Sequence, residues 1–314
     1  MKEIGGYFYL ELKEGKEYYP NLIKLNTGRN CLEYILEVRN YKKVYIPYYT
    51  CEVILEPFKK LKIEYEFYHI DKELKPVFDK QLNENEAILI NNYFGIKNNE
   101  IINICKKYKN IIVDNSQAFY DKPIKGIDTF YSARKFFGVA DGAYLSIDKK
   151  LIENFETDIS YTRMTHLLKR LDVSASFAYK DFKKNDDDLI DNPIRKMSNL
   201  TQAILKSIDY DKIKSIRETN FLYLHSVLKK FNELEIDVNS LNGSMVYPFL
   251  YKKYGLRELL IKNKVYVATY WPNVFDWAKE NTFEHKLAKY LLPLPIGQRY
   301  QIEDMQRIIN LLSA

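Results

Sequence analysis

Short apolar runs alternate with amphipathic segments between about residue 25 and residue 150, and this alternation restricts the fold more than any other feature of the chain. Apolar residues recur at helical spacing after the break at Thr27–Gly28, which predicts a helix that begins near residues 27–30. Further helices are predicted at 52–61 and 100–109. Runs rich in β-branched and aromatic residues predict strands near 42–47, 63–71, 87–95, 110–116, 128–133 and 142–148.

Strands that alternate with helices in this way predict an α/β fold with a mostly parallel central sheet flanked by helices. The strands are apolar without strict alternation, so we expect both faces of the sheet to be buried. In such sheets ligands bind beyond the carboxyl ends of the strands. Four residues stand at or just past predicted strand ends and are candidates for a site: Pro47, Asn92, Asp114 and Ser132.

The rest of the chain has a different pattern. Residues 151–172 and 199–234 are predicted to be charged helices on either side of a polar loop at 183–196. Strands are predicted near 245–251 and 264–271, and helices near 255–263 and 302–312. We therefore expect a large domain over residues 1–235, with a helical segment at about 150–235, and a small C-terminal α/β domain over residues 236–314.

Composition excludes several classes of protein. The 314 residues are 46% hydrophobic and 29% charged, which is typical of a globular chain. No apolar run is long enough for a membrane helix, and the N-terminus lacks a signal-peptide profile, so we expect a cytoplasmic protein. The three cysteines and four histidines have neither disulfide nor metal-site spacing. The net charge of +6 is spread along the chain, which disfavours nucleic acid and suits an anionic cofactor or substrate.

The segment 111–145 contains the residues that indicate a chemical function. Asp114 ends one predicted strand, and Lys135 follows the next strand with Ser132 three residues before it. Pyridoxal phosphate (PLP) requires a lysine amine to condense with its aldehyde and a carboxylate beside its ring nitrogen. Arg134 cannot replace Lys135 because a guanidinium stays protonated.

The phosphate of such a cofactor needs hydroxyls and N–H groups, which a helix N-terminus supplies. Thr27, Gly28 and Arg29 stand at the start of the first predicted helix, and Ser132 adds a hydroxyl. Each of these residues also has a structural interpretation, as a turn, a cap or a surface charge. Their coincidence with Asp114 and Lys135 is what favours a cofactor site.

The same segment resembles the DegT/DnrJ/EryC1/StrS sugar aminotransferases, which have the PLP-dependent transferase fold type I. The motif Asp114-Asn-Ser-Gln117-Ala is similar to the Asp-x-x-Gln-Ala motif of that family, and Lys135 with Asp141-Gly142 is similar to its lysine followed by Gly-Glu-Gly-Gly. The sequences at 268–272 and 292–308 resemble its closing domain. The resemblance covers the chain from about residue 24 to the end.

The resemblance implies an aminotransferase that moves an amino group, with glutamate as the expected donor, to a keto sugar that is expected to be nucleotide-linked. It implies that Asp114 contacts the pyridine nitrogen, that Gln117 lies near the phenolic oxygen, and that the chain forms a homodimer to which residues 150–235 contribute. Asn192 and Arg195 resemble a family segment that reaches the cofactor site of the neighbouring subunit. Trp271 and Arg299 are expected to pack in the small domain, with substrate contact as an alternative.

Several positions depart from the family pattern. Phe130 stands where the family often has a serine, so Ser132 is the candidate for that role. Cys51 replaces an aromatic residue that stacks on the cofactor, so Tyr49 is the candidate for that stacking. Asn92 replaces a histidine, and Ala143 replaces a glycine. These departures leave open an alternative function, a PLP-binding regulatory or sensor protein with little or no turnover. A sugar dehydratase is a weaker alternative, because such relatives replace the lysine with histidine.

Overall fold

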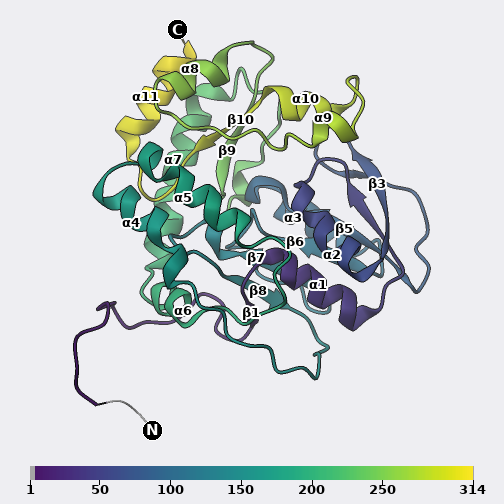
Figure 1. The fold of residues 1–314 in the computed structure, drawn as a ribbon. Helices are drawn as coiled ribbons and strands as arrows, with labels where there is room; N and C mark the ends of the chain where they lie inside the picture. Colours follow the sequence, from purple (N-terminus) through teal and green to yellow (C-terminus); the bar gives the residue numbers. More distant parts are fainter. Residues whose placement is uncertain (1–3, 314) are drawn as a thin grey trace.

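A computed structural model describes residues 4–313 and confirms the expected α/β architecture (Figure 1). Eight strands form one sheet in the order β1-β8-β7-β6-β5-β2-β3-β4. The strands are β1 (Ile23–Leu25), β2 (Lys43–Pro47), β3 (Glu64–Ile70), β4 (Pro76–Val77), β5 (Glu86–Asn91), β6 (Ile111–Asp114), β7 (Asp128–Ser132) and β8 (Ala143–Ser146). The pairs from β3 through β2, β5 and β6 to β7 are parallel, whereas β1, β8 and β4 pair antiparallel at the edges.

Both faces of the sheet are buried, as the apolar strands predicted. Along β5, Ile88 and Ile90 belong to one hydrophobic cluster, and Ala87 and Leu89 belong to another. Successive side chains of a strand point to opposite faces, so the two clusters lie on opposite sides of the sheet.

Helices cover both clusters. The helices are α1 (Gly28–Arg39), α2 (Leu55–Leu61), α3 (Asn98–Cys105), α4 (Thr165–Asp172), α5 (Ala175–Asp187), α6 (Asn199–Lys206), α7 (Tyr210–Leu228), α8 (Leu256–Lys262), α9 (Val274–Trp277), α10 (Phe283–Tyr290) and α11 (Ile302–Ser313). Helices α1 and α2 pack on the cluster that contains Leu89, whereas α3, α7 and α11 pack on the cluster that contains Ile88. Within residues 4–313, no helix is long and apolar enough to cross a membrane.

Helix α1 begins where the sequence predicted. Thr27 is its N-cap, and the Thr27 Oγ1 accepts a hydrogen bond of 3.1 Å from the N–H of Asn30. The apolar face predicted for this helix, which includes Cys31 and Ile35, is fully buried. At the other end Asn40 adopts the left-handed conformation (φ 56°), and its N–H closes the last turn on the carbonyl of Leu36.

The region after the large sheet departs from the prediction. Residues 151–160 are not helical, and Thr157 instead pairs with Lys196 through an isolated bridge. Helix α5 extends to Asp187 into the segment predicted as a loop, because Ser174 caps its start and Lys184 bonds Asp188 across one turn. The single helix predicted over 199–234 is divided between α6 and α7.

The C-terminal part contains a second sheet of two antiparallel strands, β9 (Val246–Leu250) and β10 (Leu291–Pro295). The strand predicted at 264–271 is wrong, since these residues pair with no other strand in the part of the chain that is described. The partner of β9 is a later segment, which contains two prolines. The division into domains at residue 235 stays a prediction.

The tight position of Gly142 gives a test of this packing. Gly142 has φ +117°, and a Cβ there would lie 2.9 Å from Cγ2 of Thr201. We expect Gly142→Ala to lower the free energy of unfolding by roughly 2–4 kcal/mol through strain and overpacking. Gly126→Ala is the control, because Gly126 has φ +81° but no atom within 4 Å of the added Cβ. Equal losses in urea unfolding of the two variants would contradict the crowding at Gly142.

Candidate functional site

A cavity of about 170 Å³ opens beyond the carboxyl ends of β2, β5, β6 and β7. It brings together seven of the eight residues that the sequence predicted for catalysis or cofactor binding. They are Thr27, Gly28, Arg29, Asp114, Gln117, Ser132 and Lys135. These residues come from three separate stretches of sequence, so the sheet rather than local sequence places them together.

The register of the parallel strands positions the acidic group. Asp114 pairs with Asn91 of β5 on one side and Phe130 of β7 on the other, and all three line the cavity. The N–H of Ser116 donates a hydrogen bond of 2.7 Å to Asp114 Oδ1. This bond fixes the carboxyl group at the end of β6 and leaves Oδ2 without a hydrogen-bond donor among residues 4–313.

Lys135 lies in a 3-10 turn, Ala133–Lys135, directly after β7. Its side chain is exposed at the cavity and forms no ion pair with any residue in 4–313. Cys51 lines the same cavity. Burial raises the pKa of the Cys51 thiol, and the positive charges of Lys135 and Arg29 partly oppose that rise. The thiol and the amine therefore lie within electrostatic reach of each other.

Gln117 presents a hydrogen-bond donor that has no partner. Its Oε1 accepts a bond of 2.8 Å from the N–H of Phe94, which fixes the orientation of the amide. The Nε2 atom is then the free end, and it is buried without a partner in the described part of the chain. A buried N–H donor of this kind is costly unless an acceptor reaches it, so the site fits a ligand with an acceptor oxygen at this point.

The N-terminus of α1 forms the anion-binding side of the cavity. The cap at Thr27 satisfies the N–H of Asn30, so the N–H groups of Gly28 and Arg29 remain without an intrahelical acceptor. Ser132, whose hydroxyl makes no capping bond, also lines the cavity. The guanidinium of Arg29 is bound to Glu56 at 2.6 Å, so its backbone is the part free to hold an anion.

Tyr49 does not line the cavity. Its side chain is fully buried, and its ring packs 5.5 Å from the ring of Tyr93 and 5.0 Å from that of Trp271. The turn after β2 points Tyr49 into the core and Cys51 toward the cavity. The stacking role expected of Tyr49 therefore has no support in this structure, whereas Trp271, from the C-terminal part, does line the cavity.

Asn92 lines the cavity and is held from behind by two acceptors. Its Nδ2 donates to Asn115 Oδ1 at 3.1 Å and to Asp121 Oδ2 at 2.8 Å. The other oxygen of Asp121 accepts from Asn242 Nδ2 at 2.7 Å. With both Nδ2 hydrogens used, the Oδ1 of Asn92 has no partner within residues 4–313 and acts only as an acceptor.

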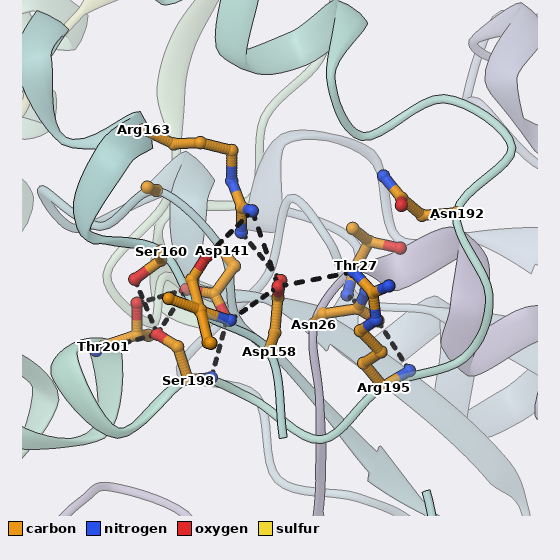
Figure 2. Close-up of polar contacts among 12 residues, drawn as sticks. Asn26, Thr27, Asp141, Asp158, Ser160, Arg163, Asn192, Arg195, Ser198 and Thr201 are labelled. Carbon is orange, nitrogen blue, oxygen red and sulfur yellow. Dashed lines mark hydrogen bonds and ion pairs between the residues drawn. The ribbon is translucent and has the colours of Figure 1, made fainter. Parts of the chain in front are cut away.

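A buried network fixes the chain that follows Lys135. Figure 2 shows the Asp141 carboxyl facing Ser198 and Thr201 at the start of α6. It accepts bonds of 2.8 Å from both the N–H and the hydroxyl of Ser198, and a third bond of 2.5 Å from the Thr201 hydroxyl. The next residue, Gly142, donates its N–H to the carbonyl of Asn26 at 2.6 Å, directly before the α1 cap.

Asn192 and Arg195 lie beside the start of α1 in the same chain (Figure 2). The carbonyl of Asn192 accepts from Asn30 Nδ2 at 3.0 Å, and the carbonyl of Arg195 accepts from the N–H of Asn26 at 3.0 Å. Neither residue lines the cavity. Their expected contact with a neighbouring subunit stays a prediction.

Several residues that line the cavity were not proposed from the sequence. They are Thr50, Val53, Ile54, Asn91, Ser116 and Phe130. Asn91 and Phe130 are the register partners of Asp114, and this register does not follow from sequence spacing. The remaining four lie in turns, where sequence spacing does not determine side-chain direction.

The donor set fits PLP better than a metal. No group of three or more His, Cys, Asp or Glu residues in 4–313 could hold a metal ion. An amine, a carboxyl, an unpartnered amide donor and a helix N-terminus instead lie around one cavity, and these match an aldehyde, a ring nitrogen, a ring hydroxyl and a phosphate.

Comparison with solved structures identifies the fold. The chain superposes with a TM-score of 0.62 on a DegT DnrJ EryC1 StrS aminotransferase from Brucella abortus, at 16% identity, over 93% of this chain and 85% of that one. It superposes with a TM-score of 0.63 on DesI in the presence of its TDP-sugar product, at 14% identity, over 92% and 79% of the two chains. NtdA from Bacillus subtilis with bound cofactor PMP also gives 0.63, at 13% identity, over 93% and 73%.

At these identities the comparisons show the fold, and the PLP-dependent transferase fold type I expected from the resemblance is confirmed. No protein-family model and no curated protein matches the sequence. The likeness to these aminotransferases is therefore detected by comparison of three-dimensional structures.

The Asp121 carboxyl behind Asn92 makes stability depend on pH. Burial raises its pKa from 3.8 to about 6, against the hydrogen bonds from Asn242 and Asn92. Between these pH values the folded protein binds more protons at Asp121 than the unfolded chain does, so stability falls as the pH rises through this window. The loss amounts to roughly 3 kcal/mol, since each pKa unit corresponds to about 1.4 kcal/mol.

We expect Asp121→Asn to flatten this dependence, because an amide does not titrate. Urea unfolding at several pH values between 4 and 6.5 measures the slope. Asp79→Asn, which changes an exposed carboxyl, is the matched control and should retain the slope of the unmodified protein. A wild-type slope in Asp121→Asn would assign the effect to another group.

Proposed function

We propose that the chain is a PLP-dependent aminotransferase that acts on a keto sugar. The observation that carries the proposal is the convergence of Lys135, Asp114, Gln117 and the N-terminus of α1 on one cavity. The fold shared with sugar aminotransferases supports it. So does the unpartnered Nε2 of Gln117, which the protein alone does not satisfy.

In this proposal each residue has one task. Lys135 Nζ holds the cofactor covalently, and the N–H groups of Gly28 and Arg29 with the Ser132 hydroxyl hold the phosphate. Asp114 keeps the ring nitrogen protonated, and Gln117 Nε2 donates to the ring oxygen. Bound PLP would supply the aldehyde that takes up the amino group and the ring that accepts the electron pair.

Lys135 would have a second task when its amine is not bound to the cofactor. The free amine would move a proton between the substrate carbon that bears the amino group and the aldehyde-derived carbon of the cofactor, first as base and then as acid. Asp114 keeps its charge beside the ring in both half-reactions. Trp271 and Ile54 give one side of the cavity an apolar wall.

The proposal also includes the amino donor, the acceptor, the cellular location and the oligomeric state. Glutamate is the proposed donor and a nucleotide-linked keto sugar the proposed acceptor, supported by the likeness to DesI with its TDP-sugar product. A cytoplasmic homodimer is also proposed. Exposed apolar residues on the extended N-terminal segment (Tyr7, Phe8) and on the α4–α5 hairpin (Leu171, Phe177) support an association of subunits.

The second candidate is a PLP-binding sensor with little turnover. Cys51 favours it, because a small thiol stands in the cavity where the related family places an aromatic ring. Glutamate distinguishes the two functions. A sensor keeps the visible absorption of its lysine-linked cofactor when glutamate is added, whereas an aminotransferase loses it.

We expect Lys135→Ala to abolish covalent attachment of PLP and to lower transamination by roughly 10²–10⁴-fold, because it removes both the anchor and the proton carrier. Borohydride reduction followed by peptide mass spectrometry measures attachment independently of activity. Lys150→Ala, at an exposed position outside the cavity, is the control. Reduced cofactor on a lysine other than Lys135 in the unmodified protein would refute the assignment.

Asp114→Asn is expected to separate binding from catalysis. The amide keeps the shape and an acceptor oxygen but cannot hold a proton on the ring nitrogen by charge. Attachment at Lys135 should persist while kcat falls by roughly a hundredfold, the size associated with one preorganised electrostatic group. Unchanged kcat in a properly loaded Asp114→Asn enzyme would remove Asp114 from the mechanism.

A further inference from the structure

A second and larger cavity, of about 800 Å³, adjoins the first. Arg134 and Lys135 line both cavities, so the proposed cofactor anchor lies between them. The α4–α5 hairpin forms one wall, and residues of α7, the end of α8 and the turn before α11 form the others. Figure 1 shows the hairpin between the large sheet and the C-terminal helices, all within one chain.

The hairpin is a well-defined element. Lys169 of α4 bonds Asp181 of α5 at 2.8 Å, and the His166 ring packs against the ring of Phe182 at 5.7 Å. Ser174 caps the second helix. The side chains that α4 turns toward the cavity are therefore held by the hairpin itself.

The walls carry an excess of positive charge. Five arginine or lysine side chains line the cavity: Arg134, Lys135, Arg170, Arg217 and Arg299. No aspartate or glutamate of residues 4–313 lines it. Only Arg134 has an acidic partner in the described chain, Asp186, which does not face the cavity.

Arg217 is a buried cation in the wall of the second cavity, and no negatively charged group in residues 4–313 compensates it. The residue is 4% exposed, and its guanidinium donates only to neutral oxygens, such as the carbonyls of Ser244 and Met245 and the side chain of Gln298. Burial lowers its pKa to about 10. A buried cation without an acidic partner is unfavourable, and an anion in the cavity would offset that cost.

Arg170 and Arg299 are the two remaining cations of the wall, and both lie beside Tyr300 rather than beside an acidic group. Both are exposed to the cavity, and neither has an ion pair with residues 4–313. Burial lowers the pKa of Arg170, and the charge of Arg299 lowers it further. Two guanidinium groups that line one cavity from different elements can share one oxyanion.

We propose that Arg170 and Arg299 together bind a phosphoryl group of the acceptor substrate, within the same subunit as Lys135. The proposal rests on the function proposed above, since it requires the substrate carbonyl to reach Lys135 while the phosphoryl group lies in the second cavity. The diphosphate of a nucleotide-linked acceptor fits better than a carboxylate because its two phosphoryl groups each carry a negative charge and together offer four non-bridging oxygens to two guanidinium forks. Arg170 and Arg299 thus select anionic acceptors.

Binding of inorganic pyrophosphate and inorganic phosphate tests the site, with glutarate as the carboxylate comparison. Protein whose cofactor has been reduced onto Lys135 is titrated by calorimetry, so that the phosphate of the cofactor already fills the N-terminus of α1. Arg170→Gln and Arg299→Gln should each weaken the tighter phosphoryl ligand by roughly tenfold, the effect of one charge-assisted hydrogen bond. Arg307→Gln, on α11 and outside the cavity, is the matched control.

The outcomes separate this inference from the proposed function. Unchanged affinity in both variants overturns the arginine site even where Lys135 carries the cofactor. Tighter binding of glutarate than of either phosphoryl ligand overturns the assignment of the anion. If reduction labels no residue, unreduced protein is titrated instead. Affinity that still depends on Arg170 and Arg299 then supports the site while the proposed function fails.

Discussion

The buried carboxyl of Asp141 is the constraint on which the arrangement of the site depends. Its three hydrogen bonds come from Ser198 and Thr201, at the start of α6. Through Gly142 the same loop bonds the backbone directly before α1 and the turn that carries Lys135. A buried carboxyl that lost its donors would be strongly unfavourable, so these three elements cannot shift separately. The distance between the lysine and the helix N-terminus is fixed in this way from outside the cavity.

The parts of the fold with a strong local signal were predictable. Helix α1 has a cap, an apolar face and a left-handed end that all agree, and the buried parallel strands are short apolar runs. The predictions of secondary structure that were wrong have local causes too. Strand β10 contains Pro293 and Pro295, which lack the N–H that a central strand needs and which an edge of a two-stranded sheet tolerates. The polar residues at the end of α5 resemble a loop because the helix lies at the surface.

The site was predictable where strand ends determine position, and not where turns do. Asp114 and Lys135 follow parallel neighbours, so their convergence follows from topology. Asn91 needed the register between β5 and β6, which sequence spacing does not give. Tyr49 and Cys51 are two residues apart in a turn, and the packing of Tyr49 between Tyr93 and Trp271 decides which one reaches the cavity. Trp271 joins them from more than 200 residues away.

The two cavities together bear on the choice between an enzyme and a sensor. The first cavity, of about 170 Å³, is small and accommodates little beyond a cofactor. A chain that only held PLP would gain nothing from a neighbouring cavity of about 800 Å³ that opens onto the same lysine. The buried Arg217 in its wall has no acidic partner among residues 4–313 and costs stability in the absence of an anion, and that cost is retained where substrate recognition offsets it. The positive second cavity therefore argues for a chain that admits a second, anionic molecule to Lys135.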